Sequence, residues 1–271
     1  MNDVKSDVKV SECSRREILV PCSLDGFEHQ IDPYIGCEHY CKYCYVLNQA
    51  ETDWTREILI HRDISAQLSE ELHGIGTQRV YMGYLTDPYQ PCEREHRQTR
   101  KVLELLAGKG FSVGILTKSD LVLRDIDVLS QMSDASISVS VAFHDNFIRR
   151  LLEHNTIDTE DRIAALHKLK EAGIRTTAML CPVIPWVTDV KRLIEELTPC
   201  AEVIWVYGLS IMDRSDQNWL DVKSVLESEY PDTCRQIEKA IFDREHSFWT
   251  DLRQELTELQ GKTRSKLNIR I

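Results

Sequence analysis

The chain has 271 residues, with 33 basic and 44 acidic side chains and a formal net charge of −11 at pH 7. This length suffices for one large α/β domain whose core needs neither disulfides nor a structural metal to fold. The acidic balance disfavours broad, nonspecific binding to nucleic-acid phosphate. The polar start and the lack of an apolar run of about 18 residues predict a cytoplasmic protein without a membrane span, whose nine cysteines stay reduced.

Apolar β-branched runs alternate with amphipathic stretches along the middle of the chain, which is typical of parallel strands joined by crossover helices. The expected strands lie at 31–35, 78–84, 111–117, 136–142, 174–181 and 202–208, and the expected helices at 62–73, 94–108, 122–132, 159–172 and 189–198. These six βα units predict either a doubly wound open sheet or a partial barrel.

Beyond the last of these units, apolar residues recur at helical spacing and predict a helical C-terminal extension. The expected organisation is an N-terminal extension over 1–29, a core over 30–214 and the helical extension over 215–271. Four basic residues near the end are interpreted as a solvated tail: Lys262, Arg264, Lys266 and Arg270.

Three cysteines, Cys37, Cys41 and Cys44, follow the first predicted strand with C-x3-C-x2-C spacing. Three thiolates so close together can hold three irons of a cubane cluster and leave the fourth iron open to an exogenous ligand. Zinc is the alternative, with His39 or Cys22 as its fourth ligand. The aromatic residues around the thiols favour the iron–sulfur cluster, because an apolar cover suits it.

Polar motifs follow each later strand, at 86–91, 117–119, 143–145, 181–185 and 210–214. Each motif alone could be an ordinary turn. In a barrel, however, all these loops converge with the cysteine loop on the C-terminal mouth, where catalytic groups of such folds lie. Their joint placement therefore favours a partial barrel with one chemically active mouth. The side chains expected there show no phosphate or carboxylate clamp: His144, Asp145, Trp186, Tyr207, Met212, Asp213 and Arg214.

The cysteine motif, which reads Asp32-Pro-Tyr-x-Gly-Cys-x-His-x-Cys-x-Tyr-Cys-Tyr45, resembles that of the radical S-adenosylmethionine (SAM) superfamily. With Thr86-Asp-Pro-Tyr-Gln-Pro91, Thr117-Lys-Ser119 and Arg124-Asp-Ile-Asp127, the chain is similar to the spore photoproduct lyase-like group. The similarity covers roughly residues 30–210. It implies an α/β fold, a partial (β/α)6 barrel with a helical extension.

The resemblance also implies a [4Fe–4S] cluster on Cys37, Cys41 and Cys44, with SAM on the fourth iron. Reductive cleavage of SAM would give a 5′-deoxyadenosyl radical that abstracts hydrogen from a small-molecule, nucleotide or peptide substrate. A ferredoxin or flavodoxin would supply the electron. Two alternatives stay open: repair of a DNA lesion like that of the lyase, and a non-enzymatic zinc or redox-sensing protein.

Further residues carry roles that the resemblance implies. Tyr43 is expected near the adenine of SAM, Asp87 at its amine or ribose, and Lys118 at its carboxylate. Ser138 and Ser140 share one strand face and would contact the ribose or methionine portion if that face points inward. Each residue also has an alternative role. Tyr43 could be aromatic cover of the cluster, Asp87 a turn cap and Lys118 an exposed lysine. The two serines could be small residues that fill the barrel.

The chain departs from the lyase that splits the thymine dimer. That enzyme carries a cysteine hydrogen donor just ahead of the Asp-containing loop, where this chain has Leu85. Cys92 and Cys181 are candidates for a different hydrogen or sulfur transfer, and the alternative for each is a buried inert thiol. Tyr45 is a candidate radical relay, and the alternative is a packing role. Together with the acidic charge, the missing cysteine weakens the case for DNA repair.

Overall fold

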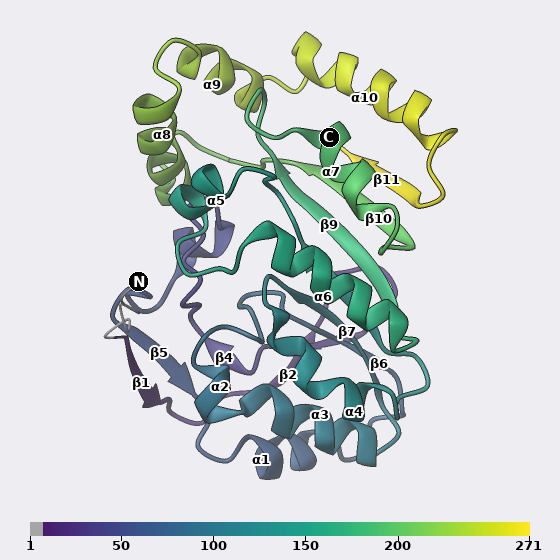
Figure 1. Cartoon of the computed structure of the whole chain (residues 1–271). Helices are drawn as coiled ribbons and strands as arrows, with labels where there is room; N and C mark the ends of the chain where they lie inside the picture. Colours follow the sequence, from purple (N-terminus) through teal and green to yellow (C-terminus); the bar gives the residue numbers. More distant parts are fainter. Residues whose placement is uncertain (1–7) are drawn as a thin grey trace.

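The centre of the molecule is an eight-stranded sheet, seen in the computed structural model, which describes residues 8–271 (Figure 1). The strands lie in the order β11-β10-β9-β8-β7-β6-β3-β2, and β2 alone among them runs antiparallel to its neighbour. They are β2 (Leu19–Pro21), β3 (His29–Ile31), β6 (Arg79–Met82), β7 (Ser112–Thr117), β8 (Ser136–Ser140), β9 (Arg175–Val183), β10 (Val203–Gly208) and β11 (Lys266–Arg270). The predicted α/β fold with a mostly parallel sheet is confirmed, and among the described residues β2 and β11 are the outer strands of this sheet.

Crossover helices cover one face of this sheet: α1 (Ile64–Glu71), α3 (Gln98–Gly108), α4 (Ile126–Leu129), α6 (Thr159–Glu171) and α7 (Val190–Leu197). On β8, Ile137 and Val139 are fully buried in the main core with the apolar side chains of these helices. Ser136 and Ser138, which alternate with them, are only partly buried. We call the face that carries these serines the inner face, and it is the face available for ligands.

The six predicted strands and five predicted helices are present, with three local differences. The strand expected at 31–35 is divided into β3 and β4 (Tyr34–Ile35), which belong to different sheets, because Pro33 between them has no N–H for a ladder. The helix expected at 94–108 breaks at Arg97, whose φ is 53°, into α2 (Glu93–His96) and α3. The helix expected at 122–132 is the 3-10 helix η2 (Asp120–Asp125) followed by α4.

The structure adds elements that the sequence pattern did not indicate. A small sheet in the order β1-β5-β4 contains β1 (Lys9–Glu12) and β5 (Glu57–Ile60). The 3-10 helix η1 (Tyr45–Gln49) follows the cysteine loop, and α5 (Asn146–Leu152) follows β8. The expected N-terminal extension over 1–29 therefore contributes strands to both sheets, although its first seven residues lie outside the described part.

The C-terminal region is helical as predicted through α8 (Gln217–Glu229), α9 (Cys234–Phe242) and α10 (Ser247–Gln260). The four basic side chains near the end of the chain are exposed, as expected, but residues 266–270 do not form a free tail. They form β11, which pairs in parallel with β10. Leu267 on this strand is 8% exposed and belongs to the main core. Within residues 8–271, no helix has the length and apolar character that a membrane span needs.

Phe27 closes the inner face at the N-terminal ends of the strands. A Cβ on Gly114 of β7 would lie 2.6 Å from Cζ of Phe27, so a larger residue at this position would displace the ring. The Arg79 guanidinium lies 4.8 Å from the centre of the same ring. The opposite, C-terminal ends of the strands are therefore the ends where a site can open.

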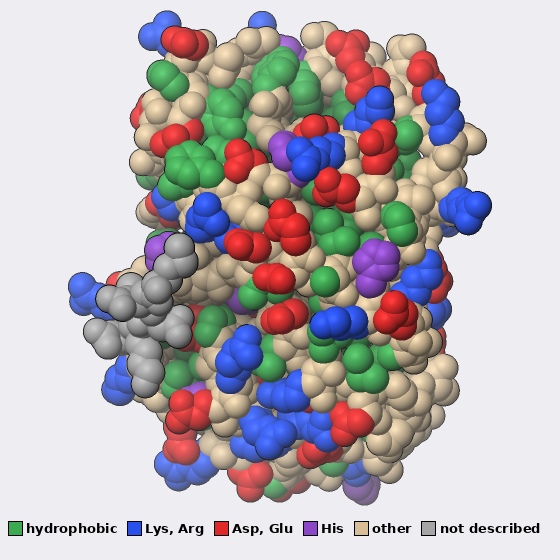
Figure 2. Space-filling model, in the orientation of Figure 1, with side chains coloured by type: hydrophobic (Ala, Val, Ile, Leu, Met, Phe, Trp, Pro, Cys, Tyr) green, Lys and Arg blue, Asp and Glu red, His purple; other side chains and the backbone are tan. Residues whose placement is uncertain are grey.

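Basic side chains gather over α2 and α3 in the lower part of the face shown in Figure 2, beside acidic ones. Arg100 pairs with Asp125 and Asp127, and the buried carboxylate of Glu93 accepts from Arg124 at 2.5 Å. These charges tie α2, α3 and η2 together, and their role is structural.

Candidate functional site

The cysteine loop lies between β4 and η1, with Cys37 and Cys41 buried and Cys44 partly buried. Gly36 introduces it with a φ of 87°, a conformation that favours glycine, and a Cβ there would lie 3.0 Å from the Trp54 ring. Backbone hydrogen bonds then fold the loop, among them the amide of Cys44 to the carbonyl of Cys41 at 2.9 Å. The sequence thus forces the three thiols into a compact turn.

Side chains from distant loops fix this turn in place. The amide of Gln90 donates to the carbonyl of Gly36 at 3.1 Å, and its oxygen accepts from the backbone amide of Glu38 at 2.8 Å. Asn155, beyond α5, donates to the carbonyl of Glu38 at 2.7 Å. The cysteine loop is therefore held from two sides by residues that follow β6 and β8.

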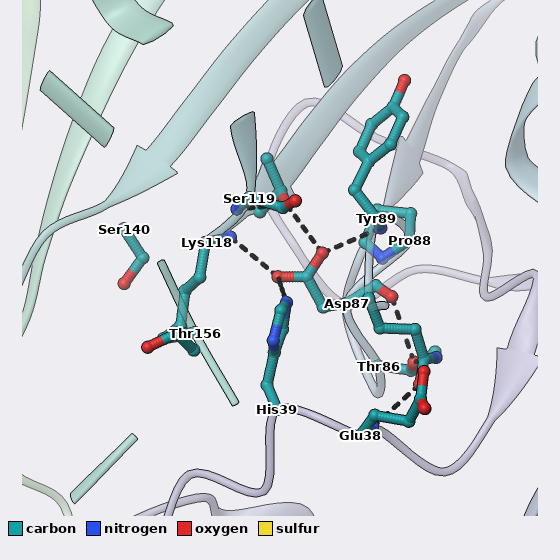
Figure 3. A network of polar contacts seen from close by, with 12 residues as sticks. Glu38, His39, Thr86, Asp87, Pro88, Tyr89, Lys118, Ser119, Ser140 and Thr156 are labelled. Carbon is teal, nitrogen blue, oxygen red and sulfur yellow. Dashed lines mark hydrogen bonds and ion pairs between the residues drawn. The ribbon is translucent and has the colours of Figure 1, made fainter. Parts of the chain in front are cut away.

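Asp87 stands at the centre of the polar network in Figure 3. One carboxylate oxygen accepts from the Tyr89 amide at 2.9 Å and the Thr117 hydroxyl at 2.6 Å, and the other accepts from the Lys118 amide at 2.7 Å. Nε2 of His39 lies 3.3 Å from the latter oxygen. Burial raises the pKa of Asp87, but the imidazole and the donors outweigh it and lower that pKa to about 2. The carboxylate thus joins the cysteine loop to the end of β7.

The Lys118 side chain extends from this point toward the thiols. Its ammonium lies 5.8 Å from the centre of the Tyr43 ring. Burial lowers the pKa of Lys118, but Cys41, Glu153 and Asp87 outweigh burial, so the pKa is raised. A permanent positive charge therefore lies beside the cysteine loop.

A buried ion pair supports the Tyr43 side of the site. Arg162 of α6 donates to the Glu153 carboxylate at 2.5 Å, and their side chains are 1% and 0% exposed. The Tyr43 hydroxyl donates to the other oxygen of Glu153. Burial raises the pKa of Glu153, but the positive charges of Arg162 and Lys118 outweigh burial. The pKa is therefore lowered, and the carboxylate stays ionised. This arrangement fixes the Tyr43 ring below the Lys118 ammonium.

The remaining predicted residues fall into two groups. Ser138, Ser140 and Cys181 share the inner face, and the Ser140 hydroxyl donates to the carbonyl of Cys181 at 3.4 Å. Burial raises the pKa of Cys181 to about 11, although Lys118 is near enough to oppose the rise. Cys92 is instead buried behind the cysteine loop, where its amide donates to Glu38. Tyr45 is 48% exposed and donates to the carbonyl of Tyr84.

The structure thus brings Tyr43, Asp87 and Lys118 to the three thiols, places Cys181 and the two serines beside them, and leaves Cys92 and Tyr45 outside this group. Sequence reasoning missed Gln90, Glu153 and Arg162. Gln90 belongs to the 86–91 motif, so its position carried a signal, whereas the Tyr43–Glu153 hydrogen bond spans 110 positions. Within residues 8–271, no group of three His, Cys, Asp or Glu side chains has the arrangement needed to hold a single metal ion.

Known proteins resemble the chain in sequence and in fold. A family model described as the radical SAM superfamily matches residues 31–197. The uncharacterized protein MJ0683 of Methanocaldococcus jannaschii is 28% identical over 246 residues, which are 89% of this chain and 92% of that protein. The radical SAM Nalpha-GlyT isomerase of Pseudomonas phage M6 is 25% identical over 173 residues, 61% of this chain and 36% of the relative.

Among solved structures, a spore photoproduct lyase mutant with bound AdoMet and dinucleoside spore photoproduct superimposes with a TM-score of 0.66. The match covers 96% of this chain and 80% of the lyase at 16% identity. At that identity, the likeness shows a shared fold.

Proposed function

The chain belongs to the radical SAM superfamily, and from this premise we propose that it reductively cleaves SAM at a [4Fe–4S] cluster held by Cys37, Cys41 and Cys44. SAM and a [4Fe–4S] cluster are the cofactors of this superfamily. When bound, they supply a 5′-deoxyadenosyl radical that abstracts hydrogen from a substrate. The observation that carries the proposal is the shared position of three thiols and the Lys118 ammonium at the C-terminal ends of the strands.

The chemistry of the three thiols supports iron–sulfur ligation. Burial and the Asp87 carboxylate raise the pKa of Cys37, whereas the backbone amides of Asp87 and His39 oppose the rise. Burial also raises the pKa of Cys44, and two amides of η1 and the Lys118 ammonium oppose it. Amide donors and a cation stabilise thiolates, the form that binds iron, so the residues fit the cluster.

The geometry around the alternative fourth ligands disfavours zinc. Nδ1 of His39 lies 2.9 Å from the Asn155 carbonyl, and Nε2 lies 3.3 Å from the Asp87 carboxylate, so the ring is directed toward Asp87. Cys22 lies beyond β2, where its sulfur accepts from the Leu24 amide at 3.5 Å. These positions disfavour His39 and Cys22 as the fourth ligand of a zinc site with the three thiols.

The contacts of Lys118 and Asp87 support different roles. Lys118 is a compact cation beside the thiols and would pair with the SAM carboxylate. Tyr43, fixed below it, would cover the adenine, and Ser138 and Ser140 would line the inner face beside the bound SAM. Asp87 already accepts from protein donors on both oxygens, so its role is to position His39 and Lys118, in agreement with the capping alternative.

We propose a small-molecule, nucleotide or peptide substrate and a ferredoxin or flavodoxin as electron donor. The second candidate function, lyase-like repair of a DNA lesion, is favoured by the shared fold. It is disfavoured by the net charge of −11 and by Leu85, 39% exposed, at the place of the lyase's hydrogen-donating cysteine.

The test is anaerobic reconstitution followed by reduction with dithionite in the presence of SAM. We expect about four irons per chain and formation of 5′-deoxyadenosine. Cys37→Ala should lose both, whereas Cys22→Ala should retain both, because only the zinc alternative uses Cys22. A colourless protein with one zinc, or a four-iron protein that never cleaves SAM with any candidate substrate, would contradict the proposal.

A further inference from the structure

Two aromatic side chains form a stack on the inner face of β10. The rings of Trp205 and Tyr207 are 5.8 Å apart with an interplanar angle of 18°. Ile204 and Val206, which alternate with them, are fully buried in the core beneath the helices. The two rings therefore point away from the core and are only partly buried. They offer a flat π surface at an open position.

The neighbouring strand adds polar groups to this surface. Trp205 pairs in register with Asn268 of β11, and Tyr207 pairs with Arg270, so both polar side chains lie on the same side of the sheet as the rings. Lys266, which pairs with Val203 two residues before Asn268, lies on this same side of the sheet. Among residues 8–271, no carboxylate lies within ion-pair distance of Lys266 or Arg270. Two cations thus stand uncompensated beside the aromatic stack.

This surface continues into the proposed catalytic site. Cys181 lies near the C-terminal end of β9 on the inner face. Burial is the main cause that raises the pKa of Tyr207, Arg270 lowers this pKa, and Cys181 is close enough to raise it. Cys181 in turn lies within electrostatic range of Lys118 and Cys44. Burial is the largest cause that raises the pKa of Tyr81 on β6, and Tyr207 contributes to the rise, so the two phenols lie within electrostatic range of each other.

We propose that Trp205, Tyr207, Asn268 and Arg270 bind the base and the phosphate of a nucleotide substrate, an assignment that rests on the proposed function. A nucleobase has a flat π face that stacks on Trp or Tyr, and the Asn268 amide can both donate to and accept from its edge. The Arg270 guanidinium matches phosphate with two parallel hydrogen bonds. The phosphate would come from a free nucleotide or from the end of a short single strand, and the overall negative charge disfavours a long polymer.

The probe is thymidine 5′-monophosphate, because a pyrimidine avoids competition with the adenine of SAM. Binding is measured by calorimetry on the anaerobic holoprotein with SAM, and the position of the base is measured by quenching of tryptophan fluorescence. Trp54, Trp219 and Trp249 are 4%, 1% and 0% exposed, so Trp205 and the 44% exposed Trp186 are the tryptophans open to a quencher. We expect Trp205→Phe to lose the quenching and Trp186→Phe to retain it.

Arg270→Gln tests the phosphate contact. The loss of a charge-assisted pair should weaken binding by about tenfold or more and reduce the salt dependence by about one unit of slope. Arg264→Gln is the matched control, since Arg264 is an exposed cation on the same segment, just before β11. Thymidine and 2-deoxyribose 5-phosphate, which each lack half of the nucleotide, should bind more weakly than the intact probe. An oligothymidylate of five nucleotides that binds more tightly than the monophosphate would identify a strand end as the source.

Equal affinity of the Arg270→Gln and Arg264→Gln proteins, or quenching that persists in Trp205→Phe, would overturn the inference, as would absence of binding to the folded wild-type protein. A circular-dichroism melt of each variant excludes unfolding as the cause. SAM cleavage by the wild-type protein tests the proposed function separately. Cleavage without nucleotide binding refutes only the nucleotide assignment, and binding without cleavage refutes only the radical chemistry.

Discussion

Asp32 shows how one side chain holds the loop that carries Asp87. One of its carboxylate oxygens accepts from the backbone amides of Tyr84, Leu85 and Thr86 at 3.0, 2.9 and 3.2 Å. Burial raises the pKa of Asp32 to about 6, against the lowering effect of these donors. The loop therefore needs an acceptor at this position more than it needs a negative charge.

We expect Asp32→Asn to change the pH dependence of stability. A carboxyl whose pKa is raised on folding contributes stability that is complete below its unfolded pKa of about 3.9 and is lost as the pH rises through 6. The effect is at most about 3 kcal/mol between pH 4 and 7, because the group is partly exposed. Asparagine keeps the accepting oxygen without titrating, so its unfolding free energy should fall less over this range.

Urea denaturation of both proteins at pH 4 and pH 7 provides the measurement. Asp32→Ala is the control, since it leaves three amides without their acceptor and should be destabilised by about 1–3 kcal/mol at both pH values. Identical pH dependence in the wild-type and Asn proteins would show that Asp32 titrates normally.

At the scale of elements, the end of β6 lies unusually close to β7. Gly83, directly after β6, has a φ of 96°, and a Cβ there would lie 2.4 Å from the backbone carbonyl oxygen of Leu116. A backbone atom of a central strand cannot move away as a flexible side chain can. This contact sets where the chain leaves the sheet toward Asp32 and Asp87.

Gly83→Ala should therefore cost more than an unfavourable φ alone. Gly74 is the matched control, since its φ is 81° and no atom lies within 4 Å of a Cβ built there. We expect about 1 kcal/mol of destabilisation for Gly74→Ala and roughly 3 kcal/mol or more for Gly83→Ala. Chemical denaturation measures both values, and iron content should fall only in the Gly83 variant. Equal losses in the two proteins would mean that the β6–β7 approach is adaptable.

At the scale of the whole molecule, the order of elements along the chain was predictable and their long-range partners were not. From β6 to β10 each strand pairs with the next strand along the chain, and β3 pairs with β6, across β4 and β5 of the small sheet. Alternating apolar patterns were therefore enough to predict the sheet, and C-x3-C-x2-C was enough to indicate the thiol site. Glu153 carries no comparable signal, because its partner Tyr43 lies 110 positions away. Asp32 begins the cysteine motif, but its hydrogen-bond partners lie 52 to 54 positions away and were not predictable. The period of two in β11 was hidden by its basic residues.

The pairing of β11 with β10 makes the C-terminal region part of the core sheet. Leu267 is 8% exposed and joins the main hydrophobic core with Ile204 of β10 and Leu256 of α10. A helical extension that begins at residue 215 as a separate unit would unfold in its own transition. A region that completes the sheet should unfold together with the barrel.

Leu267→Ala distinguishes these two cases. We expect a loss of about 2 kcal/mol in a single cooperative transition, because a buried leucine is truncated inside the shared core. Leu220→Ala provides the matched control, since Leu220 on α8 is 48% exposed and should cost less than about 0.5 kcal/mol. Urea unfolding followed by both far-ultraviolet circular dichroism and tryptophan fluorescence gives the measurement. Two separate transitions would support the domain boundary at residue 214. Coincident transitions would mean that the core sheet, including β10 and β11, and the helices α8 to α10 fold as one unit.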